Sequence, residues 1–137
     1  IEALTKIKSY VDYGAFTPVQ VAAVTALNGP QECVLDIRET YKKRRDVLIE
    51  SFKRVGWDNI PIPEASMFVW APLPKKYKKI GSMEFAKNLM IKAGVAVAPG
   101  LAFGKNGEGF VRIGLVENTQ RIRQASKNIK KFFEHFK

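Results

Sequence analysis

One arginine interrupts an apolar strand pattern late in the chain. Val111, Ile113 and Leu115 alternate along the strand that the sequence predicts at 110–116, so they share one face. Arg112 falls on the other face and points away from the core. A guanidinium on a rigid strand can bind a carboxylate or a phosphate through two parallel hydrogen bonds. A solvated or structurally paired arginine fits the same pattern, so the strand alone leaves both interpretations open.

Glycines cluster just before this strand, at Gly104, Gly107 and Gly109. Their spacing partly matches a nucleotide-binding loop. Such a loop must open a helix whose N-terminus holds the phosphate, whereas this one leads into a strand. We therefore reject a dinucleotide-binding site here.

Apolar periodicity and turn residues predict the elements that position Arg112. Helices are expected at 3–12, 18–28, 31–55, 83–93 and from 119 to the C-terminus, and strands at 66–71, 95–98 and 110–116. This order predicts an α/β fold, a small mixed or antiparallel sheet with helices packed on one side, preceded by a long connecting helix. The helix at 18–28 has almost no polar face, so we expect it to be buried on most sides.

Several polar residues are placed to cap these helices. Thr17 and Gln20 form a predicted capping box at the second helix, with Pro18 at its first helical position. Ser82 is the expected cap of the fourth helix. Asn118 or Thr119 is expected to cap the last one.

Composition limits the classes of function. The chain has 137 residues, 46% of them hydrophobic, and a formal net charge of +10, which suits one domain with a real core. The basic residues fall on amphipathic helices and in a loop, without a recognisable nucleic-acid motif, so we expect solvated faces and no nucleic-acid partner. With one cysteine and one histidine, we expect no disulfide and no metal site.

The sequence also bears on membranes and targeting. No apolar run approaches the length that crosses a bilayer, and the first residues do not resemble a signal peptide. We therefore expect a cytoplasmic localisation and no membrane partner. The chain begins without methionine and inside a predicted helix, so we also expect it to be part of a longer polypeptide.

Five segments, in order and spacing, resemble one family. They are 8–23, 26–30, 41–46, 65–71 and 97–104, and the last leads to the segment 111–115 that contains Arg112. Together they resemble the C-terminal portion of a class I (fold type I) PLP-dependent aminotransferase of the aspartate, alanine and LL-diaminopimelate aminotransferase branch. The resemblance covers essentially the whole chain. In that family an arginine on the late small-domain strand binds the substrate α-carboxylate, and Arg112 occupies its motif position.

The resemblance implies a division of the chain and a set of partners. Residues 1–30 would form the C-terminal end of the large PLP-binding domain, 31–55 the connecting helix, and 56–137 the small C-terminal domain. The helix at 18–28 would pack against the upstream large domain or the second subunit of a homodimer. The full-length enzyme would transfer an amino group between an amino acid and a 2-oxo acid, with pyridoxal 5'-phosphate as its cofactor.

The sequence departs from the family at the catalytic group. The reaction needs a lysine amine that holds the cofactor and shuttles a proton. In the family this lysine lies in a Ser-x-Ser-Lys type segment followed by Gly-x-Arg-x-Gly, and no segment here matches. We therefore assign no catalytic residue in this fragment, expect no cofactor bound to it, and expect the fragment alone to be inactive.

Other residues with possible roles favour structural interpretations. The turn 13–17 resembles a segment that approaches the neighbouring subunit's active site, which makes Thr17 a possible contact there, although a capping role fits equally well. Cys33 is expected to be a small packed hydrophobe rather than a reactive thiol. His135 favours the negative end of the last helix over catalysis.

The strand at 66–71 carries large side chains near the proposed site. Met67, Phe68 and Trp70 are predicted to belong to the sheet core rather than to the site.

A second class of function stays open on the sequence. The chain could be a stand-alone basic module that uses Arg112 and its glycine loop to bind an anionic ligand or nucleic acid. Binding that weakens steeply with salt would favour this alternative.

Overall fold

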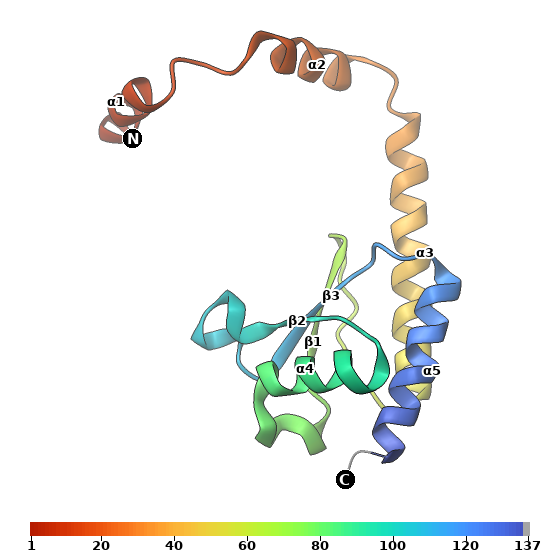
Figure 1. The fold of residues 1–137 in the computed structure, drawn as a ribbon. Helices are drawn as coiled ribbons and strands as arrows, with labels where there is room; N and C mark the ends of the chain where they lie inside the picture. Colours follow the sequence, from red (N-terminus) through yellow and green to blue (C-terminus); the bar gives the residue numbers. More distant parts are fainter. Residues whose placement is uncertain (136–137) are drawn as a thin grey trace. The chain divides into compact units, whose positions relative to one another are not determined.

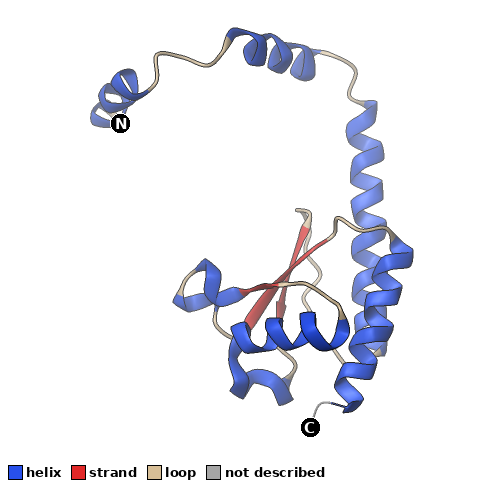
Figure 2. Cartoon of the chain, viewed as in Figure 1, coloured by secondary structure: helices blue, strands red, loops and turns tan. Residues whose placement is uncertain are grey.

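A computed structural model gives the fold and describes residues 1–135 (Figure 1). The chain forms two compact units, Ile1–Asp36 and a second that begins at Ile37. Helices dominate, and three short strands form one antiparallel sheet in the second unit (Figure 2). The α/β fold class predicted from the sequence is therefore confirmed. Among the described residues, no helix is both long and apolar enough to cross a membrane.

The first unit holds two short helices and the start of a third. α1 spans Glu2–Val11, α2 spans Thr17–Asn28, and α3 begins at Glu32. Within residues 1–36 no residue is buried, and Leu27 of α2 is 80% exposed. The apolar side chains of α2 are therefore exposed. The burial that the sequence predicts for this helix is not found within the described residues.

The predicted capping box at α2 is wrong. Thr17 is already the first residue of the helix, and Phe16 occupies the N-cap position without a side-chain hydrogen bond. Gln20 donates its side-chain amide to the Ala15 carbonyl instead of reaching the backbone at the cap. Pro18 does lie in the first turn, as expected.

The second unit places the sheet among helices and tight turns. α3 ends at Arg54, α4 spans Gly81–Ala93, and α5 spans Thr119–His135, of which the last is the end of the described chain. The strands are β1, Phe68–Pro72, β2, Ala98–Pro99, and β3, Phe110–Gly114. Short 3₁₀ turns lie at Lys75–Ile80, Gly100–Phe103 and Lys105–Gly107.

β3 is the central strand of the sheet. The strand order is β1-β3-β2, and both neighbours run antiparallel to β3. The strand expected at 95–98 is instead the two-residue β2, Ala98–Pro99. It ends there because Pro99 has no N–H for the ladder and the chain turns at Gly100. β3 ends at Gly114 rather than at 116.

One hydrophobic cluster joins the sheet to the helices. Val69, Val111 and Ile113 face the buried side of the sheet together with residues from α3, α4 and α5. Trp57 lies in this cluster, with its ring 5.3 Å from that of Phe52, and donates its indole N–H to the Pro72 carbonyl at 2.8 Å. The helices therefore pack on the face opposite Arg112, as the sequence predicts.

The cap of α5 agrees with the sequence. Asn118 precedes the helix, and its side-chain oxygen accepts a hydrogen bond from the Arg121 backbone N–H at 2.9 Å. Such a bond satisfies one of the free N–H groups of the first turn.

Candidate anion-binding site

Arg112 lies in the middle of the sheet on its outer face. It pairs with Trp70 of β1 and with Ala98 of β2, so a strand lies on each side of it. Its neighbours Val111 and Ile113 are buried, whereas Arg112 is half-buried. The side chain thus leaves the core, as the alternation along the strand predicts.

Two phenylalanine rings contact the Arg112 guanidinium. Its central carbon lies 4.2 Å from the centre of the Phe68 ring and 4.3 Å from that of Phe103. Trp70 adds a second layer, with its ring 5.6 Å from Phe103 in an edge-on arrangement and 5.7 Å from Phe110 in a stacked one. The outer face of the sheet is therefore an aromatic surface built around one cation.

This arrangement corrects the expectation for β1. Met67 and Trp70, predicted in the sheet core, are each 37% exposed, and Phe68 is half-buried against Arg112. The core residues of this strand are instead Val69 and Ala71. Because side chains alternate along a strand, the core position of Val69 places Phe68 and Trp70 on the outer face, whereas Met67 precedes the strand.

The Arg112 guanidinium has no protein acceptor within residues 1–135. None of the ion pairs or side-chain hydrogen bonds among these residues uses it. A guanidinium stays charged and carries five N–H donors, so its hydrogen-bonding capacity is available to a bound anion. The alternative of a structurally paired arginine therefore finds no partner in the described chain.

The segment after β2 carries Phe103 across to this face. Two of its glycines touch: a Cβ added at Gly100 would lie 1.9 Å from the Gly107 carbonyl oxygen, and one at Gly107 would lie 2.1 Å from that of Gly100. No side chain fits at either position. The glycines thus fold this loop back on itself and lead into β3, which agrees with our rejection of a dinucleotide-binding loop.

A serine and a glutamate fasten the loop to α4. Ser82 is fully buried. Its backbone N–H donates to Glu108 Oε1 at 2.6 Å, its hydroxyl donates to Oε2 at 3.0 Å, and that hydroxyl accepts from the Leu101 N–H at 3.2 Å. Glu108 also accepts from the Gly109 N–H at 2.8 Å. The first turn of α4 and both ends of the loop therefore meet at the Ser82–Glu108 pair: Leu101 binds the Ser82 hydroxyl, and Gly109 binds the Glu108 carboxylate.

The sequence predicts Ser82 as the N-cap of the fourth helix, and the structure corrects this. α4 begins at Gly81, so Ser82 is inside the helix, and Ile80 at the N-cap position makes no side-chain hydrogen bond. The backbone N–H of Ser82, in the first turn, instead donates to the Glu108 carboxylate, which lies outside the helix. Sequence reasoning missed Glu108, because nothing local to it signals a partner 26 residues away.

The contacts of Glu108 shift its ionisation. Hydrogen bonds from the Ser82 and Gly109 backbone N–H groups, in that order, hold the pKa of the Glu108 carboxyl below its usual range. Desolvation acts in the opposite direction, and the Ser82 hydroxyl adds to the lowering. The carboxylate is therefore favoured over the protonated form.

Arg44 fixes the chain at the other end of β3. From α3 its guanidinium donates to the carbonyl oxygens of Leu115 at 3.0 Å and of Val116 at 3.1 Å. Tyr41, one turn earlier, lies with its ring 5.4 Å from that guanidinium. Both ends of the strand that carries Arg112 are thus held to helices.

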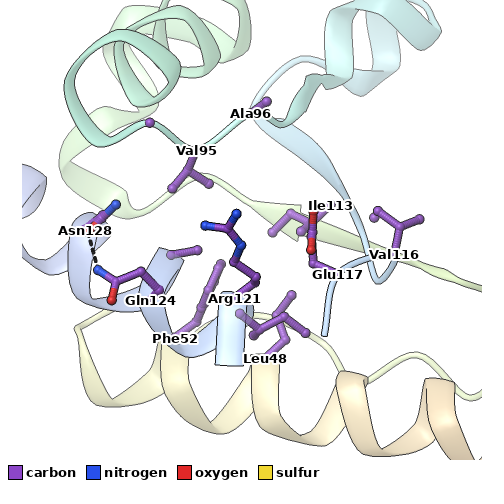
Figure 3. A pocket seen from close by; sticks show the side chains of 14 residues that line it. Leu48, Phe52, Val95, Ala96, Ile113, Val116, Glu117, Arg121, Gln124 and Asn128 are labelled. Carbon is purple, nitrogen blue, oxygen red and sulfur yellow. Dashed lines mark hydrogen bonds between the residues drawn. The ribbon is translucent and has the colours of Figure 1, made fainter. Parts of the chain in front are cut away.

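A pocket opens on the other side of the same sheet (Figure 3). Its apolar walls include Phe52 of α3, Val95 and Ile113, whose side chain lies on the opposite face of β3 from Arg112. Arg121 reaches into it from the start of α5, and Gln124 donates to the side chain of Asn128 at 2.9 Å. The walls contain no lysine, histidine or cysteine among the described residues. This pocket is separate from the face that carries Arg112.

The remaining candidate residues lie elsewhere. Thr17 is exposed and belongs to the first unit, whereas Arg112 belongs to the second. Cys33 is exposed, so its expected packing is absent from the described residues. His135 Nδ1 lies 2.8 Å from the Lys131 carbonyl oxygen in the last turn of α5, in line with a helix-end role.

Comparison with known proteins identifies the family. Residues 1–129 match the family described as aminotransferase class I and II. The chain is 56% identical to a putative aminotransferase AatC of Rhizobium meliloti over 96% of its length, and 53% identical to the glutamate-pyruvate aminotransferase AlaC of Escherichia coli over 97%. It spans about a third of these relatives, 32% of each.

Solved structures agree with the sequence relatives. The substrate-bound structure of BacF from Bacillus subtilis matches 96% of the chain with a TM-score of 0.84 at 31% identity, and the chain covers 33% of it. A probable N-succinyldiaminopimelate aminotransferase from Thermus thermophilus matches 95% with a TM-score of 0.79 at 33% identity, and 34% of it is covered. The resemblance inferred from the sequence is confirmed, and the chain belongs to the class I and II aminotransferase family.

Proposed function

We propose that this chain is the C-terminal part of a PLP-dependent aminotransferase and that Arg112 binds the α-carboxylate of its substrate. The observation that carries the proposal is the Arg112 guanidinium, which contacts two aromatic rings and has no protein acceptor within residues 1–135. The whole protein would transfer an amino group between an amino acid and a 2-oxo acid. The name of the relative AlaC, a glutamate-pyruvate aminotransferase, supports this class of substrates.

Arg112 would both bind and orient the substrate. Two parallel hydrogen bonds from a guanidinium to a carboxylate fix the position and the plane of the carboxylate. The attached Cα then points in a defined direction, which lowers the entropic barrier to removal of its proton. Half-burial among aromatic rings strengthens the charge interaction relative to water.

The described residues offer no place for the cofactor's lysine. Every lysine within residues 1–135 is exposed, whereas a lysine that forms a Schiff base is activated by a desolvated or cationic environment. When bound, pyridoxal phosphate supplies the electron sink of such reactions. We propose that the residues that hold it lie in the rest of the protein and that this chain alone is inactive.

The exposed first unit supports the proposed division of the chain. Residues 1–30 would complete the large domain, 31–55 would form the connecting helix, and 56–137 the small domain. Since α2 exposes its apolar side chains, the upstream large domain or the second subunit of a homodimer would cover it. Thr17 at its start would then lie near the neighbouring subunit's site.

Replacement of the arginine in the full-length protein tests the proposal. We expect Arg112→Ala to lower kcat/KM for amino-acid and 2-oxo-acid substrates about 100-fold or more, because two charged hydrogen bonds are lost. The absorbance of the bound cofactor should stay unchanged. Arg123→Ala, which removes an exposed arginine from α5, is the matched charge control. An unchanged kcat/KM in Arg112→Ala would contradict the role of Arg112.

The isolated chain tests the second part of the proposal. Purified residues 1–137, mixed with pyridoxal phosphate and both substrates, should form no product. Turnover above that of the cofactor in free solution would contradict our assignment of the catalytic lysine to the rest of the protein.

A further inference from the structure

The two rings that contact Arg112 are held in different ways. Phe68 belongs to β1 and pairs in register with Gly114, so the sheet itself fixes its position. Phe103 lies at the end of the 3₁₀ turn Gly100–Phe103, outside every strand. Its ring is 49% exposed, yet it lies 4.3 Å from the Arg112 guanidinium.

Contacts on either side of Phe103 hold its loop in place. The Leu101 N–H donates to the buried Ser82 hydroxyl at 3.2 Å, and that hydroxyl donates to Glu108 at 3.0 Å. Gly100 and Gly107 pack backbone against backbone, which closes the loop. Because these contacts fix the loop, they also fix the position of the Phe103 ring, although that ring is half exposed.

The chemistry of the pair explains what a fixed ring does for Arg112. A guanidinium is planar, and its N–H donors point outward in that plane. A ring against its face attracts the cation without using any N–H group. The side chain then loses rotational freedom before the anion arrives, while all of its donors stay available.

We propose that Phe103 is a positioning residue that holds the Arg112 guanidinium ready for the substrate carboxylate, with its loop anchored by Ser82 and Glu108. This inference rests on the proposed function of Arg112. Trp70 of β1 also packs against the Phe103 ring, with the two ring centres 5.6 Å apart. The ring does not take part in the reaction; it acts through Arg112.

Kinetics of the full-length aminotransferase test the proposal. Phe103→Leu keeps an apolar side chain but removes the ring, and we expect it to raise KM for amino acids about 3- to 10-fold with kcat nearly unchanged. Phe103→Tyr should restore the wild-type KM, because it restores the ring. Leu101→Ala is the matched control: this side chain is 42% exposed on the same turn, and only its backbone N–H makes the anchoring contact.

A double-mutant cycle separates positioning from a general structural effect. If Phe103 acts through Arg112, the effect of Phe103→Leu should vanish in an Arg112→Ala background. A full effect in that background, or an unchanged KM in Phe103→Leu when Arg112→Ala is impaired, would overturn this inference and leave the role of Arg112 intact. An unimpaired Arg112→Ala would overturn the proposed function itself. Because Phe103 is half exposed, thermal unfolding of Phe103→Leu should match wild type.

Discussion

Ser82 and Glu108 lie 26 positions apart, yet the Ser82 backbone N–H donates to Glu108 Oε1 at 2.6 Å and the Ser82 hydroxyl donates to Oε2 at 3.0 Å. The pair joins the first turn of α4 to the segment that enters β3. The carboxylate thus satisfies one backbone N–H group of the first helical turn, that of Ser82. It also fixes the loop that precedes Arg112.

Replacement of this carboxylate should weaken the fold in a pH-dependent way. Glu108→Gln replaces the charged acceptor with a neutral amide, so we expect a lower free energy of unfolding at neutral pH. The folded pKa of Glu108 lies below its usual value of 4.5, so its contribution is complete above that value and is lost as the pH falls through the folded pKa. Urea unfolding at a series of pH values measures the effect.

The difference between the two proteins should therefore shrink as the solution is acidified. Glu117→Gln, which removes the charge of another exposed glutamate, is the matched control. If Glu108→Gln and wild type differed by the same amount at neutral and acidic pH, the charge of Glu108 would not be the cause.

Replacement of Gly100 tests whether the close backbone contact between Gly100 and Gly107 stabilises the fold. Gly100→Ala would place a Cβ 1.9 Å from the Gly107 oxygen and 2.7 Å from the Phe110 oxygen. Because both are backbone atoms, we expect a loss of about 3 kcal/mol or more in the free energy of unfolding. Denaturant titration measures it. Gly114→Ala, whose Cβ would meet side-chain atoms at 3.8 Å, should be nearly neutral; equal losses in both variants would refute the argument.

The sequence sufficed to predict the element that carries Arg112 and the direction of its side chain. A single charged residue in an apolar strand shows which of the two faces points to solvent. The alternation then assigns every other residue of the strand to a face. β1 has no such marker, since 66–71 is apolar almost throughout. The pattern therefore predicts Met67, Phe68 and Trp70 in the core alike, whereas Phe68 and Trp70 alternate with the buried Val69 and Ala71.

Contacts between distant segments could not be predicted from local patterns. The capping box at Thr17 has the right residue types, yet Gln20 binds the Ala15 carbonyl. Ser82 has the right type for a cap, but its hydroxyl bridges Glu108 and Leu101. For Gln20 a carbonyl only five residues away competes with the cap, whereas the positions of the Ser82 partners depend on the tertiary fold.

Arg44 should stabilise the far end of β3. Arg44→Met keeps a good helix former in α3 but removes both hydrogen bonds to the carbonyls of Leu115 and Val116. We expect a loss of about 1–3 kcal/mol, because two carbonyls lose a charged donor. Thermal and urea unfolding measure this loss.

A second arginine on the same helix provides the comparison. Arg54 pairs with Glu50 on an exposed surface, so Arg54→Met should cost no more than about 0.5 kcal/mol. A loss in Arg54→Met as large as that in Arg44→Met would mean that charge removal from α3, rather than the ties to β3, sets the stability.

The exposed first unit predicts self-association of the isolated chain. Val24 and Leu27 are 59% and 80% exposed, and no residue within 1–36 is buried. Apolar surface of this kind associates unless a partner covers it. We expect residues 1–137 to form concentration-dependent oligomers in sedimentation experiments. A chain that starts at Gln31 lacks α1 and α2 but keeps α3 whole, and it should associate less.

Two lysine substitutions on α2 test whether its apolar side chains cause that association. Val24→Lys with Leu27→Lys should reduce oligomers of the isolated chain, because lysines on an exposed helix stay hydrated. In the full-length protein the same pair should lower stability, because there it would bury two charges against the large domain or the partner subunit. A stable full-length double variant would contradict the proposal that α2 is covered. Opposite effects in the two contexts would place residues 1–30 with the rest of the enzyme.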